Sequence, residues 1–223
     1  MAAMSQEIFL AMRQSIIDGA PEHAVALAQQ ALQSGIEPLD AINQGYVPGI
    51  THIGEQFGRH EVFLPDIMMA AEAMKKAVAV LEPEMQKRGL QRQTLGTIVL
   101  GTVKGDIHEI GKNLVGTLLS ASGFRVFDLG TDVAAEKFAR KAAEVEADVV
   151  GVSALLTTTM MRQKSVVEAL RREGMGRVKV IVGGAPVTRN WATEIGADGY
   201  APDALRALEL VKSIISVTSN TVT

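Results

Sequence analysis

Apolar residues in the first part of the chain recur at helical spacing. From about residue 5 to residue 86 they stand three or four positions apart, and Pro21, Pro38 and Pro65 occupy places where helices can begin. These signals predict four amphipathic helices, each with one apolar and one polar side. Short helices of this kind bury their apolar sides against one another, so we expect a four-helix bundle that forms a first domain over residues 1–90.

The pattern changes after residues 87–94, KRGLQRQT, a polar segment that fits neither helical nor strand spacing. We predict a linker there, with a domain boundary between residues 90 and 91. Beyond it, short runs rich in Val and Ile alternate with helical patterns. The second domain, residues 91–223, is therefore α/β. We expect strands at 96–103, 124–129, 148–152 and 178–182 with a short fifth near 199–200, and helices at 110–122, 133–146, 157–172 and 202–215.

Continuous apolar strands that alternate with helices are typical of a parallel sheet covered on both faces. We expect a flavodoxin-like, doubly wound sheet of five strands in the order 2-1-3-4-5. In that order the first, third and fourth strands are neighbours, and right-handed crossovers bring the loops after them to one edge. These loops are GDIHEIG (105–111), SALLTTTM (153–160) and GGAPV (183–187). We expect the three loops to form one site.

Composition limits the chemistry of that site. The net charge of -3 over 223 residues gives no basic surface for nucleic acid. The absence of Cys excludes disulfides, thiolate zinc sites and cysteine-held iron–sulfur clusters. The four His are too widely spaced in the sequence to form a zinc site. A metal would need His, carboxylate or an organic macrocycle. The sequence has no leader pattern and no run of eighteen or more apolar residues, so we expect a cytoplasmic protein that binds neither membrane nor nucleic acid.

The first of the three loops contains Asp106, His108 and Gly111 in the pattern DxHxxG. A histidine at the carboxyl end of a parallel strand is well placed to meet a ligand. The pattern is short, and an Asp two residues before a His is also typical of a helix N-cap beside a surface histidine. The three loops contain no GxGxxG or Walker motif, and their small residues, hydroxyls and one His favour a large neutral ligand.

Taken together, GTVKGDIHEIGKN (101–113), the loop at 153–159 and the GGAP turn (183–186) resemble the cobalamin-binding domain of methionine synthase and of the small corrinoid proteins of anaerobic methyltransferase systems. Residues 54–74, GEQFGRHEVFLPDIMMAAEAM, resemble the helical cap of that family, so the likeness covers nearly the whole chain. It implies that the cofactor is cobalamin or a related corrinoid, cycling between methylcob(III)alamin and cob(I)alamin. It also implies base-off, His-on binding, with His108 as the lower axial ligand of cobalt.

The same resemblance implies roles for further residues. Asp106 would bind the other ring nitrogen of His108, and Thr159, where methionine synthase has serine, would complete a proton relay. The displaced nucleotide tail would run into the sheet, past the loops after the third and fourth strands, and two cap residues, Phe57 and Leu64, would cover the methyl face. The residues expected to contact the corrinoid are Asn43, Phe57, Leu64, Ile67, Gly105, Asp106, Ile107, His108, Glu109, Ile110, Gly111, Ser153, Leu155, Thr157, Gly183, Gly184, Ala185, Tyr200 and Ala204.

The function that the resemblance implies is that of a non-catalytic methyl carrier. A substrate-specific methyltransferase would load a methyl group on cobalt(I), and a second methyltransferase would pass it to tetrahydrofolate or coenzyme M; a reductive activase is a further expected partner. Two alternatives stay open. A cobalamin-binding subunit of an adenosylcobalamin-dependent mutase shares DxHxxG, although Phe57 and Leu64 would obstruct the adenosyl group. A cobalamin-based sensor would need an output domain.

Overall fold

Residues 2–88 and 94–219 are described by a computed structural model, in which the chain divides into two units, residues 1–93 and 94–223. Most of the predicted linker, and the predicted boundary after residue 90, fall on residues 89–93, which lie outside the described residues.

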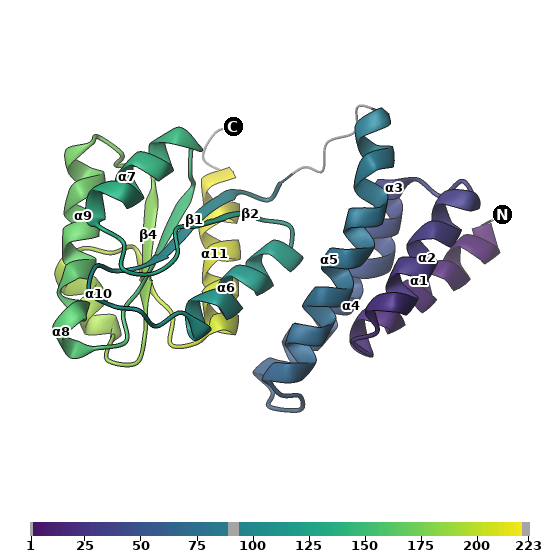
Figure 1. Ribbon diagram of the computed structural model, residues 1–223, viewed down its shortest axis with the longest axis horizontal. Coiled ribbons are helices and arrows are strands. Elements are labelled where there is room, and N and C mark those ends of the chain that lie inside the picture. Colours follow the sequence, from purple (N-terminus) through teal and green to yellow (C-terminus); the bar gives the residue numbers. More distant parts are fainter. Residues whose placement is uncertain (1, 89–93, 220–223) are drawn as a thin grey trace. The chain divides into compact units, whose positions relative to one another are not determined.

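The first unit is helical, as its apolar spacing predicts. Over residues 2–88 it contains α1 (Ala2–Ile17), α2 (Pro21–Gln33), a continuous helix made of α3 (Pro38–Asp40), η1 (Ala41–Tyr46) and α4 (Val47–Gly58), and finally α5 (Leu64–Lys87) (Figure 1). The η1 segment is π-helical. The three predicted prolines all lie in the first turn of a helix. The predicted four-helix bundle is confirmed.

Tyr46 fixes the middle of this bundle. Its side chain is fully buried, and its hydroxyl donates to the carbonyl of Ala24 on α2 at 2.6 Å. Burial raises the pKa of the Tyr46 phenol well above its usual range, so the hydroxyl keeps its proton and its hydrogen bond. Met12, Ile53 and Met74, from three different helices, are also buried. One core therefore holds the four helices together.

Residues 94–219 contain a five-stranded parallel sheet whose strands lie in the order β2-β1-β3-β4-β5. This confirms the predicted strand order. Every residue of β1 is buried, because parallel strands in the middle of such a sheet are covered on both faces. In Figure 1, helices flank the sheet on both sides. The strands are β1 (Thr97–Thr102), β2 (Arg125–Asp128), β3 (Val149–Ser153), β4 (Lys179–Gly183) and β5 (Gly199–Tyr200).

The helices of this unit are divided between the two faces of the sheet. Figure 1 shows α6 (Ile110–Ala121) and α11 (Ala204–Ser219) on one face and α7 (Ala135–Glu144) and α9 (Arg162–Arg172) on the other. The helix predicted at 157–172 is interrupted at Met161, which separates the short α8 (Thr157–Met160) from α9.

One helix, α10 (Arg189–Ile195), is not predicted by the apolar pattern. It has only seven residues, too few to display helical spacing. The Thr188 hydroxyl caps its start by accepting from the N–H of Trp191 (3.2 Å), and Gly196 ends it in a left-handed conformation. Trp191 is buried in the core cluster that it shares with α7 and α9.

Candidate functional site

Three loops meet at the carboxyl edge of the sheet, as the strand order predicts. They follow β1, β3 and β4, and backbone hydrogen bonds connect each loop to the next. The N–H of Val103 donates to the carbonyl of Ser153 (3.0 Å), and the N–H of Ala154 donates to the carbonyl of Gly183 (3.2 Å). The loops therefore form one continuous wall, which we call the loop wall.

Asp106 is the buried centre of the loop wall, and donors satisfy both of its carboxylate oxygens. Oδ1 accepts from Nδ1 (2.7 Å) and from the backbone N–H (3.1 Å) of His108. Oδ2 accepts from the Thr159 hydroxyl (2.6 Å) and from the backbone N–H of Leu155 (2.8 Å). Burial opposes ionisation of Asp106, but the hydrogen bonds from Thr159 and His108, with those from the backbone, outweigh it. They hold the pKa of the Asp106 carboxyl well below its usual range.

His108 extends from this buried centre towards the surface, and its side chain is 47% exposed. An ionised carboxylate can only accept a hydrogen bond, so Nδ1 of His108 carries the hydrogen and Nε2 of the neutral ring keeps its lone pair. Within the part of the chain that the structure describes, Nε2 has no protein hydrogen-bond partner. A histidine that a carboxylate orients in this way is suited to bind a metal through its other nitrogen.

Asp132, which sequence reasoning misses, braces the backbone that carries Asp106. It lies in the loop after β2 with a φ of +56°. Its Oδ1 accepts from the N–H of Gly105 (2.7 Å), and its own N–H donates to the carbonyl of Asp106 (2.9 Å). Its Oδ2 forms an ion pair with Lys104 (2.8 Å). An Asp that follows a predicted strand indicates a turn. It does not indicate which residues the Asp132 side chain contacts.

Lys112 is a second residue whose role the sequence does not show. Although it lies within the polar motif, its side chain is buried. It forms an ion pair with Asp128 at the end of β2 and donates to Oδ1 of Asn113 (2.7 Å). The first turn of α6, which begins two residues after His108, is thereby tied to the neighbouring strand.

Exposed apolar side chains gather around His108. Ile107 and Ile110 are 76% and 79% exposed. Soluble proteins seldom leave such groups together in water unless a ligand or partner covers them. Over residues 94–216 the exposed large apolar side chains are those of Ile107, Ile110, Leu155 and Leu156 on the loop wall, Met161 between α8 and α9, and Leu95 at the opposite end of the sheet.

The turn after β4 passes very close to the loop after β3. Gly184 has a φ of +126°, and a Cβ on it would lie 1.8 Å from the carbonyl oxygen of Ala154, so only glycine allows this approach. Tyr200 of β5, half-buried, pairs with Val182 next to this turn, and Ala204 is buried at the start of α11. The predicted residues that lie on the loop wall are 105–111, Ser153, Leu155, Thr157, Thr159 and 183–185.

The remaining predicted residues lie in the helical unit. Asn43 is exposed on the π-helical η1, a kind of insertion that often occurs at functional sites. Phe57 near the end of α4 and Leu64 at the start of α5 are half-buried and keep some free surface. Ile67 is fully buried and has none in this conformation. Contact between these four residues and a corrinoid stays a prediction.

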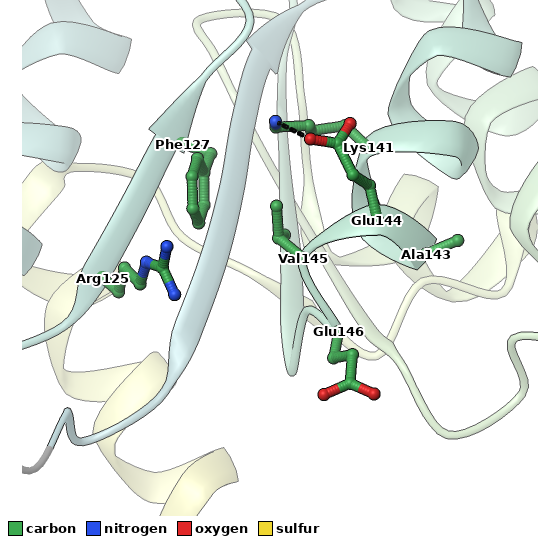
Figure 2. Close-up of a pocket in the computed structure, with 7 residues that line it drawn as sticks. All are labelled: Arg125, Phe127, Lys141, Ala143, Glu144, Val145 and Glu146. Atoms are coloured by element: carbon green, nitrogen blue, oxygen red, sulfur yellow. Dashed lines mark hydrogen bonds and ion pairs between the residues drawn. The ribbon is translucent and has the colours of Figure 1, made fainter.

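A separate pocket lies at the amino end of the sheet (Figure 2). It is lined by Arg125 and Phe127 of β2 and by Lys141 and residues 143–146 around the end of α7. The Arg125 guanidinium and the Lys141 ammonium lie 4.8 and 4.9 Å from the centre of the Phe127 ring, and Lys141 also pairs with Glu144 (2.7 Å). None of the predicted site residues lines this pocket, so it is distinct from the loop wall.

Two family models match the chain, and both are described as a B12 binding domain. One matches residues 96–209, which include the loop wall, and the other matches residues 8–82 of the helical unit. A corrinoid protein of Desulfitobacterium hafniense (strain Y51) is 48% identical over 206 residues, which cover 92% of this chain and 95% of that protein. The chain belongs to the B12-binding corrinoid proteins.

Further relatives match this corrinoid protein over both of its domains. The trimethylamine corrinoid protein 2 of Methanosarcina acetivorans is 45% identical over 214 residues, 96% of this chain and 99% of that protein. Among solved structures, a chain of the methanol:cobalamin methyltransferase complex MtaBC from Methanosarcina barkeri matches with a TM-score of 0.86 at 30% identity, over 94% of this chain and 80% of that chain. The architecture, a helical cap domain before a Rossmann-like B12-binding domain, is that of corrinoid proteins.

The loop wall of this corrinoid protein fits a B12-type cofactor, which combines a broad macrocycle with a metal that accepts a nitrogen ligand. Ile107 and Ile110 offer apolar surface before and after His108 in the sequence. A Cβ placed on Gly111 would meet no neighbouring group within 4 Å, so the start of α6 leaves open space beside the motif. Among the helices that the structure describes, none is both long and apolar enough to cross a membrane.

Proposed function

We propose that this corrinoid protein carries a methyl group between two methyltransferases. A bound corrinoid would supply the cobalt on which the methyl group is held. The observation that carries the proposal is the pair formed by Asp106 and His108, in which a buried, ionised carboxylate holds a half-exposed imidazole at 2.7 Å. The names of the relatives support it, since they are corrinoid proteins of methylamine systems and a methanol:cobalamin methyltransferase complex.

In this proposal His108 is the lower axial ligand, and the cofactor is bound base-off and His-on. Asp106 keeps Nδ1 protonated, so the neutral ring offers Nε2 to the metal. Thr159 would support this arrangement, because its 2.6 Å hydrogen bond keeps the Asp106 carboxylate in place.

In this proposal the nucleotide tail of the corrinoid runs into the sheet past the loop at 153–157 and the turn at 183–185, with Tyr200 and Ala204 beside the turn. Small residues in both segments support the assignment, because they let a ligand approach the backbone. The cap residues, Asn43, Phe57, Leu64 and Ile67, would cover the opposite side of the macrocycle and exclude water from it.

The partners of the proposed carrier are a substrate-specific methyltransferase, a second methyltransferase that uses tetrahydrofolate or coenzyme M, and a reductive activase. The proposed location is the cytoplasm. The relatives named above include both amine and methanol systems, so the proposal leaves the choice of methyl donor to the first partner. Their names are those of corrinoid and methyltransferase proteins rather than of mutases or sensors.

The cofactor part of the proposal is tested by titrating the full chain with cobalamin and recording absorbance and electron paramagnetic resonance spectra. We expect saturable binding, and a cobalt(II) spectrum whose nitrogen splitting changes when histidine is labelled with ¹⁵N. His108→Ala should abolish this label sensitivity. His23→Ala, which removes an exposed histidine on α2, is the matched control and should behave like the wild type.

Two results would contradict this assignment. Absence of binding by the wild type would refute the corrinoid site, and a His108→Ala protein with the wild-type spectrum would refute ligation by His108. The carrier role is tested with the methyl-loaded protein and a purified methyltransferase from the same organism. Formation of methyltetrahydrofolate or methyl-coenzyme M is expected, and a methyl group that stays on the protein with every such partner contradicts the role.

A further inference from the structure

Gln163 is a buried polar side chain for which the proposed function has no role. It lies on α9 and is 0% exposed. Its Nε2 donates to the carbonyls of Val152 (3.0 Å) and Gly183 (3.1 Å), and its Oε1 accepts from the indole Nε1–H of Trp191 (2.9 Å). Because an indole can only donate and a carbonyl can only accept, these partners determine which end of the amide is oxygen.

The two carbonyls lie where neighbouring strands end. Gly183 is the last residue of β4 and pairs in the ladder with Ser153, the last residue of β3, and Val152 directly precedes Ser153. The NH₂ group of Gln163 thus spans the boundary between β3 and β4. It does so where these strands give way to the loops at 153–157 and 183–185. Trp191, from α10, holds the amide from its other end.

The loops that start there tolerate little change in their separation. The Gly183 carbonyl accepts from both Gln163 and the N–H of Ala154, so one oxygen joins the two loops. Gly184 then passes so close to Ala154 that no side chain fits between them. A close-packed contact of this kind transmits a small shift at the strand ends into the loops.

We propose that Gln163, held by Trp191, is a positioning residue that sets the spacing of the loops after β3 and β4 and thereby makes the protein selective for corrinoids with a nucleotide tail. The inference rests on the proposed function, which assigns the tail to these loops. Gln163 acts through the backbone of Val152 and Gly183 and does not itself touch the ligand.

The experiment compares the affinities of the full chain for cobalamin and for cobinamide, which has the macrocycle but no nucleotide tail. Gln163→Met keeps the length of the side chain and removes all three hydrogen bonds. We expect its affinity for cobalamin to fall about tenfold, and its affinity for cobinamide to stay within about twofold of the wild type. Trp191→Phe keeps both hydrogen bonds from Gln163 to the strands. It should therefore also lower the affinity for cobalamin, but by less than Gln163→Met does.

Two further variants separate positioning from folding. The double variant Gln163→Met/Trp191→Phe leaves no unpaired amide or indole, so it should regain stability in urea relative to Gln163→Met and still lack selectivity for the tail. Asp148→Ala is the matched control. Asp148 joins two strands at the amino end of the same sheet, where its Oδ2 accepts from the N–H of Thr97 (2.7 Å), and its loss should leave the ratio of the two affinities unchanged.

The outcomes distinguish the inference from the proposal beneath it. The inference would be overturned if Gln163→Met left the ratio of the two affinities unchanged, or lowered both affinities in parallel. It would also be overturned if the wild type bound both ligands equally. None of these results would contradict the corrinoid site. A wild type that binds neither ligand would overturn the proposed function itself.

Discussion

The hydroxyl of Thr159 lies 2.6 Å from Oδ2 of Asp106, although 53 positions separate the two residues in the sequence. The hydroxyl comes from α8, after β3, and the carboxylate comes from the loop after β1. Because Asp106 in turn orients His108, the position of the imidazole depends on how two strands pair.

Replacing Thr159 by Val should destabilise the protein and change its response to acid. The variant keeps the shape of the side chain but removes a donor to a buried carboxylate, which costs about 1–3 kcal/mol of unfolding free energy near neutral pH. The low folded-state pKa of Asp106 stabilises the fold above the unfolded-state pKa of about 3.9, and this stabilisation is lost as the pH falls through and below that value. Thr159→Val raises the folded-state pKa, so it should lose less stability on acidification than the wild type.

Urea unfolding followed by Trp191 fluorescence, near neutral pH and at about pH 3, measures both effects. Thr159→Ser keeps the hydroxyl and should resemble the wild type at each pH. Equal acid sensitivity of Thr159→Val and the wild type would show that the hydroxyl does not stabilise the ionised carboxylate.

Gly111→Ala should have opposite effects on stability and on corrinoid binding. Gly111 lies in α6 with open space where a Cβ would be, so alanine should stabilise the free protein by about 0.5–1 kcal/mol through its helix propensity. The same methyl group would occupy space that the proposed site leaves for the corrinoid, and it should weaken binding. Ser120→Ala, at an exposed position of the same helix, should leave binding unchanged. Undiminished corrinoid affinity in Gly111→Ala would place the cofactor away from the start of α6.

The ion pair between the buried Lys112 and the exposed Asp128 should respond unequally to loss of either partner. Asp128→Asn leaves the Lys112 ammonium buried without its counter-charge, and we expect a loss of about 3 kcal/mol in the free energy of unfolding. Lys112→Met removes the buried charge itself and leaves Asp128 partly in water, so its effect should stay within about 1 kcal/mol. Urea unfolding of both variants measures the difference, and equal losses would argue against an uncompensated charge as the cause.

Asp132→Ala should disturb the loop that carries His108, whereas Asp132→Asn should not. Alanine loses the hydrogen bond to Gly105 and is strained at a φ of +56°, which together cost about 2 kcal/mol. Asparagine tolerates that φ and keeps the acceptor, and it loses only an exposed ion pair with Lys104. The measurement is unfolding free energy together with the NMR resonances of the His108 ring. Unchanged His108 resonances in the alanine variant would show that Asp132 does not position the histidine.

Spacing along the chain was sufficient to predict the architecture. Helical and strand periods are local properties, so the bundle and the alternation of strand and helix follow from them. The strand order was predicted from the flavodoxin-like fold, one of the common arrangements of such alternating units. Short segments escape this reasoning. The seven residues of α10 are too few to show a period, and the break at Met161 leaves no mark in the apolar pattern of residues 157–172.

Some features of the site could likewise be predicted from neighbouring residues in the sequence, whereas others depend on contacts between distant segments. Asp106 and His108 stand two positions apart, and the resemblance to the cobalamin-binding family implied that the carboxylate binds the ring. The burial of Lys112, the brace from Asp132 and the contact of Gln163 with two strand ends are decided only by the tertiary structure. The physical reason is that a polar side chain can be buried only where donors or acceptors from other segments surround it, and parallel strands must pair before those segments meet.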